Sequence, residues 1–236
     1  MTERNVDDAE IAKFEALASR WWDPTSEFKP LHDINPLRAN WIDQFAKVDG
    51  KTLLDVGCGG GLLSEAMAWR GATVTGIDMG EAPLAVANIH RLDSELSIDY
   101  QKITAEDIAQ RQPAEFDVVC CLEMLEHVPD PAAVIAACAT LAKPGAHLFF
   151  STINRNPKAY AFAIIGAEYV LKLLPRGTHE YSKFIRPSEL SCWLREAGLQ
   201  LTDITGLTYN PISKHYRLKA TDVSVNYMMH AIKPTL

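Results

Sequence analysis

The sequence predicts an α/β fold with a mostly parallel, seven-stranded sheet, helices on both faces and an antiparallel hairpin at its C-terminal edge. Short apolar runs alternate with segments of helical periodicity, which is typical of a parallel sheet whose crossovers are helices. A glycine-rich stretch follows the first of these runs. Two further apolar runs come after the last predicted helix, and because no helix separates them they indicate the hairpin.

The predicted elements begin with two helices. Asp7 to Trp22 has helical periodicity and ends before Pro24, because proline disfavours a helical residue in front of it. A second helix begins at Pro36, which suits a first helical turn, and runs to Phe45. Strands are then predicted at residues 52–56, 73–77, 98–103, 116–122, 146–152, 199–207 and 215–229, and helices at 60–70, 82–93, 131–142 and 187–197.

The composition is that of an ordinary globular protein, since 47% of the 236 residues are hydrophobic and 22% are charged. We expect a single domain over residues 1–236, with an N-terminal helical extension at 1–47 and an apolar insertion at 155–186. The net charge of −7 disfavours a protein built to bind nucleic acid. The five cysteines lack C-x-x-C spacing, the N-terminus lacks an apolar signal core, and no apolar run reaches about 20 residues, so we expect a cytoplasmic protein.

The glycine loop after the first predicted strand reads D-V-G-C-G-G-G. Gly57 and Gly59 let the backbone approach a ligand closely, and Asp78, at the end of the next strand, can accept hydrogen bonds from both hydroxyls of a ribose. Leu62 stands where a dinucleotide fingerprint would have its last glycine. Asp55 instead suits a positively charged ligand such as S-adenosylmethionine. The alternative, an ordinary strand-to-helix turn, would not need four glycines and two acids.

The loop and its two acids resemble the first two motifs of class I methyltransferases, and this resemblance implies S-adenosylmethionine as the cofactor. Ligands of open α/β sheets bind at the carboxyl ends of the strands, so residues after later strands are further candidates. Glu106 follows the third predicted strand and could face the adenine. Leu122 ends the fourth strand and either packs on the adenine or is only the last core residue.

The fourth predicted strand leaves through the segment E-M-L-E-H-V-P-D-P. If this exit is a helical turn, Glu123, Glu126 and His127 share one face beside the cofactor. Two carboxylates and an imidazole can then bind a divalent ion such as Mg²⁺, although histidine is not its preferred ligand. Alternatively, His127, with Glu126 beside it, is a catalytic base for the nucleophile. In a third interpretation the two residues only tether the loop.

Other segments are specific to one kind of methyltransferase. They are Ala12 to Glu15, Ser19 to Asp23, Phe28 to His32, Ile34 to Arg38, Asp55 to Gly61, Gly76 to Met79, Glu123 to Pro131, Ser151 to Arg155, Gly166 to Tyr169, Thr178-His179, Tyr209 to Pro211 and Val225 to Met228. Together they resemble the ubiquinone-biosynthesis O-methyltransferase family over nearly the whole chain. The resemblance implies methylation of 2-polyprenyl-6-hydroxyphenol and of 3-demethylubiquinol, by an enzyme compatible with a complex of ubiquinone-biosynthesis enzymes.

The same resemblance implies individual site residues. Cofactor contacts would come from Arg38, Gly57, Asp78 with its neighbour Met79, and Leu122. Eukaryotic relatives imply Mg²⁺ on Glu123, Glu126 and His127. Arg38 would clamp the methionine carboxylate of the cofactor with a two-pronged salt bridge; its alternative is a surface arginine that lies beside Trp41.

The apolar insertion contains a run of mostly apolar residues at 157–176, between basic flanks. Six basic and two acidic residues lie between 155 and 186, so this segment is locally positive on a negative chain. Such a helix can lie on an anionic bilayer surface, where a polyprenyl substrate resides, or it can be a lid over the site. Membrane contact would place the protein on the inner face of the plasma membrane. Rival functions are another small-molecule or tRNA methyltransferase, or a cofactor-binding scaffold without turnover.

Overall fold

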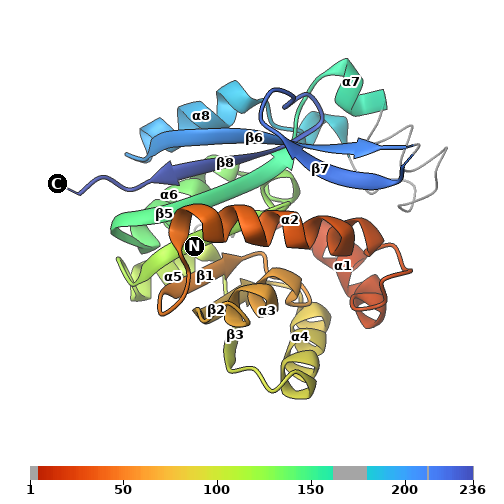
Figure 1. The fold of residues 1–236 in the computed structure, drawn as a ribbon. Helices are drawn as coiled ribbons and strands as arrows, with labels where there is room; N and C mark the ends of the chain where they lie inside the picture. The colour runs from red at the N-terminus through yellow and green to blue at the C-terminus, as the bar shows by residue number, and fades with distance from the viewer. Residues whose placement is uncertain (1–4, 162–179, 212, 236) are drawn as a thin grey trace.

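An eight-stranded sheet in the order β3-β2-β1-β4-β5-β8-β6-β7 forms the centre of the protein (Figure 1). The computed structural model describes residues 5–161, 180–211 and 213–235. The strands are β1 (Thr52–Val56), β2 (Thr73–Asp78), β3 (Ile98–Lys102), β4 (Phe116–Leu122), β5 (Ala142–Ile153), β6 (Gln200–Asn210), β7 (His215–Lys219) and β8 (Asn226–Ile232). Strands β1 to β5 are parallel to one another, β8 pairs antiparallel with both β5 and β6, and β7 pairs antiparallel with β6. The predicted fold class is confirmed.

The predicted number of seven strands is wrong, because the segment expected as one strand at 215–229 is two. β7 pairs with β6 at the edge of the sheet, and β8 inserts between β5 and β6. A turn at Asp222 separates them: its backbone N–H donates to Lys219 O, and its carboxylate accepts from Ser224. Aspartate favours such turns because its side chain binds the backbone two residues on.

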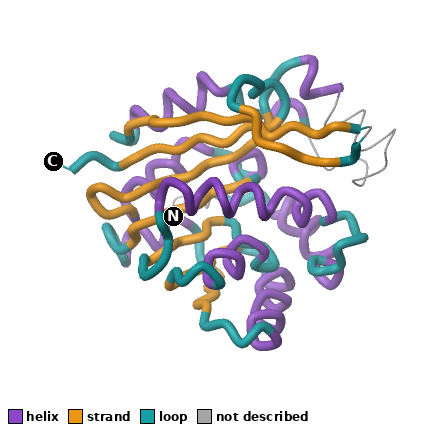
Figure 2. The backbone as a smooth tube through the Cα atoms, viewed as in Figure 1, coloured by secondary structure: helices purple, strands orange, loops and turns teal. Residues whose placement is uncertain are grey.

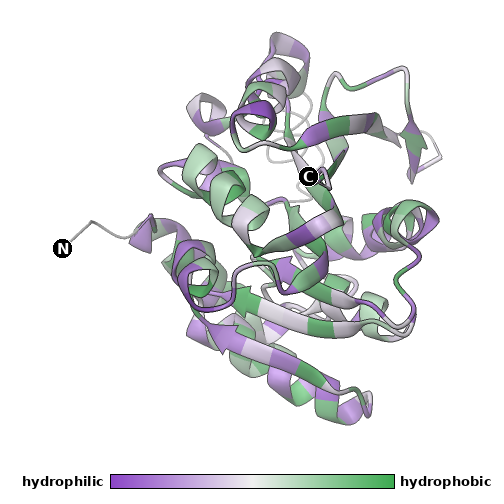
Figure 3. Ribbon diagram, turned by 90° about the vertical axis from the view of Figure 1, so that its left-hand side faces the viewer, coloured by the Kyte–Doolittle hydropathy of each residue, from purple (hydrophilic) through white to green (hydrophobic). Residues whose placement is uncertain are grey.

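Helices cover both faces of the sheet (Figure 2). They are α1 (Asp8–Leu17), α2 (Lys29–Ala46), α3 (Leu62–Ala68), α4 (Glu81–Asp93), α5 (Ala105–Arg111), α6 (Pro131–Leu141), α7 (Pro157–Ala159) and α8 (Pro187–Glu196). Neighbouring β1 residues point to opposite faces: Leu53 packs in the core under α2 and α3, whereas Leu54 packs under α5, α6 and α8. Figure 3 shows the apolar residues gathered on the strands between the helices.

One helix prediction needs correction, and one helix was missed. The second helix begins at Lys29 and not at Pro36, so this proline lies inside α2. A proline removes one helical hydrogen bond, but Ile34, Ala39 and Ile42 bury one continuous apolar face around it, which outweighs that loss. The short α5 was not predicted, because its seven residues are too few for a clear periodicity; the Thr104 side chain caps it.

The ends of the predicted insertion are described as α7 and the 3-10 helix η4 (Tyr181–Lys183), and its apolar centre at 162–179 lies outside the described residues. Within the described ranges, no helix is both long and apolar enough to cross a membrane. The expected N-terminal extension contains α1, the 3-10 helix η1 (Ala18–Arg20) and α2. Helix α1 lies beside the beginning of α2 and close to α4, so the extension flanks the carboxyl ends of the first strands (Figure 1).

Candidate functional site

The loop after β1 is turned sharply by its glycines. The backbone N–H groups of Gly57 and Cys58 both donate to Ile77 O, at 2.9 and 3.0 Å, which fixes the loop to the end of β2. Gly57 has a φ of 73°, and a Cβ there would overlap the side chain of Met124. A residue with a side chain would therefore be strained as well as crowded. Position 57 therefore requires glycine.

Asp78 holds the glycine loop from the end of β2. Its Oδ2 accepts from the N–H of Gly59 at 2.9 Å, and its Oδ1 accepts from the N–H of Gly80 at 2.7 Å. Burial raises the pKa of Asp78, while the hydrogen bonds to Gly80 and Gly59 oppose that shift. Each carboxylate oxygen keeps a second lone pair. The side chain lines the pocket and can accept further hydrogen bonds from a ligand there.

Two buried charges, Asp55 and Arg38, line the same pocket. Asp55 is 3% exposed, and its Oδ2 accepts from Ser64 Oγ at 2.6 Å. Burial raises the pKa of Asp55 to about 6. Arg38 is 4% exposed, its Nη1 lies 3.9 Å from Glu123 Oε1, and its Nε has no hydrogen-bond partner among the described residues. A buried guanidinium with an open donor suits a carboxylate ligand.

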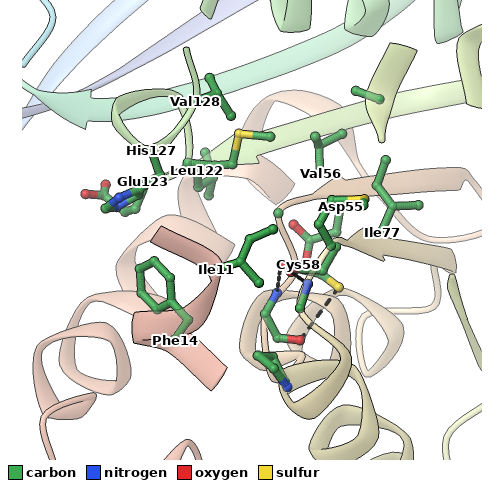
Figure 4. A pocket seen from close by; sticks show the side chains of 18 of the residues that line it. Ile11, Phe14, Asp55, Val56, Cys58, Ile77, Leu122, Glu123, His127 and Val128 are labelled. Carbon is green, nitrogen blue, oxygen red and sulfur yellow. Dashed lines mark hydrogen bonds between the residues drawn. The ribbon is translucent and has the colours of Figure 1, made fainter. Parts of the chain in front are cut away.

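All eight cofactor residues expected from the sequence line this one pocket. Met79 follows Asp78 on one wall, and Leu122 lies across from the loop residue Cys58 (Figure 4). Glu106 lies at the start of α5, where its Oε1 accepts from Asn5 Nδ2 at 2.8 Å. Their expected roles in binding stay predictions, and the structure places them where one ligand can reach them.

The N-terminal segment supplies a wall that the sequence did not predict. Ile11 and Phe14 of α1 face the glycine loop across the pocket (Figure 4). Trp21 packs against the backbone of Gly59 and Gly60, and its ring stacks on Phe28 with centroids 4.2 Å apart. The apolar periodicity of α1 predicted a buried face, but it did not indicate that this face covers the glycine loop.

The exit of β4 is not the helical turn that would place Glu123, Glu126 and His127 on one face. Glu123 has a φ of 52°, and only Leu125–His127 form a short 3-10 helix, η2. Glu123 Oε1 accepts from Ser151 Oγ at 2.6 Å, and its Oε2 accepts from Asn226 Nδ2 at 2.8 Å. Glu126 and His127 point to other partners.

Glu126 turns into the protein, because its Oε2 accepts from Thr152 Oγ1 at 2.8 Å and only 4% of the residue is exposed. It does not line the pocket, unlike His127. Burial, with the nearby Glu123 charge, raises the pKa of Glu126 to about 7. His127 Nδ1 lies 2.9 Å from Glu10 Oε2 on α1. Although burial opposes it, the hydrogen bond from His127 to Glu10 and the surrounding carboxylates raise the pKa of His127.

These three side chains do not fit a common Mg²⁺ ion as they are placed. Each is committed to a different protein partner, and within the described part of the chain no group of three histidine, cysteine, aspartate or glutamate side chains could hold a metal. A divalent ion needs several oxygen ligands that converge on one point. We therefore derive no catalytic step through a metal.

The comparisons with known proteins agree with this geometry. A methyltransferase-domain model matches residues 31–204. A ubiquinone biosynthesis O-methyltransferase from Pseudomonas syringae pv. tomato is 71% identical over 229 residues, which cover 97% of this chain and 98% of that protein. The chain belongs to the ubiquinone biosynthesis O-methyltransferase family. A second member, from Saccharophagus degradans, is 70% identical over 231 residues, or 98% of each chain.

The family resemblance seen in the sequence is thus confirmed, and solved structures agree on the fold. Magnesium protoporphyrin IX methyltransferase from Synechocystis PCC 6803, with bound SAH, matches 94% of each chain with a TM-score of 0.70 and 18% identity. The same enzyme with bound SAM matches with a TM-score of 0.65. At this identity the likeness concerns the fold alone.

Proposed function

We propose that the protein transfers a methyl group from S-adenosylmethionine to a phenolic hydroxyl of polyprenylated ubiquinone precursors. The substrates would be 2-polyprenyl-6-hydroxyphenol and 3-demethylubiquinol, as family membership suggests. The observation that carries the proposal is one pocket that combines the glycine loop, the buried Asp55 and Arg38, Asp78 and His127.

The pocket residues match the charges of the proposed cofactor. Asp78 would accept the two ribose hydroxyls, and Glu106 and Leu122 would flank the adenine. Asp55 would face the ammonium group and the sulfonium, and Arg38 would bind the carboxylate. A bidentate arginine–carboxylate pair is strong where water is excluded, and both Arg38 and Asp55 are almost fully buried.

His127 would act as the base. Its Nδ1 is engaged by Glu10, which leaves Nε2 as the ring nitrogen that can accept the proton of the phenol. When bound, S-adenosylmethionine supplies an activated methyl group. The pocket aligns the oxygen with that methyl group, and such alignment lowers the barrier by several kcal/mol. Base catalysis contributes about 10²–10⁴-fold in rate.

A turnover assay tests the proposal. Purified protein is incubated with methyl-labelled S-adenosylmethionine and either a short-tail catechol or a short-tail demethylubiquinol. We expect label in the O-methylated product, and we expect His127→Ala to lower kcat about 10²-fold or more while S-adenosylhomocysteine still binds. A variant with nearly unchanged turnover would remove the base assignment. Absence of product from both substrates would contradict the proposed activity.

We also propose that the segment at 157–176 brings the enzyme to the inner face of the plasma membrane, where its substrate resides. The sequence supports this through the apolar run and its basic flanks. Flotation with anionic and neutral liposomes compares the wild type with a Lys172→Glu/Arg176→Glu variant. We expect the wild type to float with anionic vesicles and the variant to stay at the bottom. Equal flotation of both would contradict the proposal.

A further inference from the structure

Glu10 is a buried carboxylate on a helix that otherwise carries its charges on the surface. Only 6% of it is exposed, and it is the only buried residue of α1. Its Oε2 lies 2.9 Å from His127 Nδ1, and its Oε1 accepts from Lys13 Nζ at 2.9 Å and from Lys183 Nζ at 3.2 Å. A buried carboxylate is stable only when it is paired in this way.

The position of the His127 ring is set largely from α1. Phe14, one turn after Glu10, meets the imidazole edge-on, with ring centroids 5.1 Å apart and planes at 90°. Glu10 therefore fixes the tautomer by accepting from Nδ1, and Phe14 restricts the tilt of the ring. Neither residue belongs to the strand exit that carries His127, so both contacts exist only while α1 is docked.

We propose that Glu10 is a positioning residue that holds the proton of His127 on Nδ1 and directs Nε2 at the phenol, and that docking of α1 over the bound cofactor completes the catalytic base. The inference rests on the proposed methyl transfer. In that step the phenol oxygen bonds to the methyl carbon, the methyl–sulfur bond breaks with its electron pair left on sulfur, and the phenol proton goes to Nε2. The imidazolium so formed is stabilised by the Glu10 carboxylate.

The charges around His127 support this role. His127 faces Glu10 on α1, and Glu10 is also contacted by Lys13. The carboxylates of Glu123 and Glu126, on the same strand exit as His127, lie nearby as well. The hydrogen bond with His127 and the contacts with the lysines hold the pKa of Glu10 far below its usual value, so it stays ionised. An ionised carboxylate at Nδ1 makes the imidazole more basic than a neutral acceptor would.

Helix α1 connects His127 with both the cofactor pocket and η4. Ile11 and Phe14 line the cofactor pocket, so a bound cofactor would favour the docked position of α1. Lys183, in η4 near the C-terminal end of the predicted insertion, pairs with Asp7 at 3.0 Å and with Glu10 at 3.2 Å. The base is therefore assembled from three segments that are distant in sequence.

The test compares Glu10→Gln with Asp8→Asn, which removes the same charge from an exposed position of α1. We expect Glu10→Gln to lower kcat about 10–100-fold, with an acidic limb of the pH profile at lower pH. Its dissociation constant for S-adenosylhomocysteine should stay within about threefold of the wild type, which also shows that the variant is folded. Asp8→Asn should behave as the wild type, and Glu10→Asp should recover part of the rate.

Nitrogen-15 NMR of the imidazole in the S-adenosylhomocysteine complex gives a readout that does not depend on turnover. We expect a protonated Nδ1 on His127 in the wild type and a lower pKa of this ring in Glu10→Gln. An unchanged His127 spectrum, or an unchanged kcat, would overturn the role of Glu10. If the wild type transfers no methyl group, the proposed function fails, whereas the spectrum still decides whether Glu10 sets the state of His127.

Discussion

The indole of Trp21 lies against the backbone of Gly59, in the space that a side chain on this glycine would occupy. The ring is buried, and its Nε1 has no hydrogen-bond partner in the described residues. The neighbouring Trp22 Nε1 donates to Gly60 O at 2.8 Å. These contacts fix the N-terminal extension to the glycine loop, so each segment stabilises the conformation of the other.

Gly59→Ala should weaken cofactor binding, because the new methyl group overlaps Trp21 and the residue has a φ of 53°. We expect the dissociation constant for S-adenosylhomocysteine, measured by calorimetry, to rise about tenfold or more. Gly50→Ala is the matched control: its φ is 72°, but nothing lies within 4 Å of the added carbon. Equal affinities for the two variants would show that the contact with Trp21 does not matter.

Asp78→Ala should remove the acceptor proposed for the ribose hydroxyls and release Gly59 N–H and Gly80 N–H, which Asp78 now holds. A lost hydrogen bond to a charged group changes a binding free energy by about 1.5–3 kcal/mol. We therefore expect the dissociation constant for S-adenosylmethionine to rise by about 10–100-fold. Asp93→Ala, at an exposed position at the end of α4, serves as the control and should leave the affinity unchanged.

Binding of S-adenosylmethionine should release a proton near pH 6. Burial raises the pKa of Asp55 to about 6 in the free protein, and a cation beside it would lower that pKa again. The affinity should therefore fall as the pH drops below about 6. Calorimetry in two buffers with different heats of ionisation measures the proton release. Asp55→Asn should abolish it, and a release that persists in this variant would assign the proton to another group.

Glu126 should make the protein less stable as the pH rises. Its pKa is about 7 in the fold against a usual value of 4.5, so the unfolded chain loses this proton first. The stability contribution is thus present below pH 4.5 and is lost as the pH rises toward 7. Glu126→Gln keeps an acceptor for Thr152 and cannot ionise.

We expect the melting temperature of Glu126→Gln to match the wild type near pH 5 and to exceed it by roughly 3–8 °C at pH 8. Thermal unfolding followed by circular dichroism across this range measures the difference. Glu115→Gln, at an exposed position before β4, is the control. Parallel curves for the wild type and Glu126→Gln would contradict a raised pKa of Glu126.

Local sequence patterns were enough to predict the glycine loop and its acids. Asp55, Gly57 and Gly59 are almost contiguous, and Asp78 ends the very next strand, so the fold brings them together without further information. The role of Arg38 was predicted from the family resemblance. The sequence pattern of its helix does not indicate that this arginine is buried, as the structure shows it to be.

The features that were missed depend on contacts between distant segments. Glu10 reads as one of several surface acids on a helix, and its partner His127 is 117 positions away. Its spacing of four residues from Phe14 was the one signal, because it places both on the same helical face. The position of β8 between β5 and β6 likewise could not be predicted from local patterns, because β8 pairs with these two strands and not with β7, which precedes it in the sequence.

Calorimetric titration of the purified protein with S-adenosylhomocysteine and, separately, with NADH tests the central claim most directly. The pocket under α1 predicts saturable binding of S-adenosylhomocysteine that Asp78→Ala weakens, and no binding of the dinucleotide. Binding of NADH alone, with no heat from the adenosyl ligand, would contradict the account.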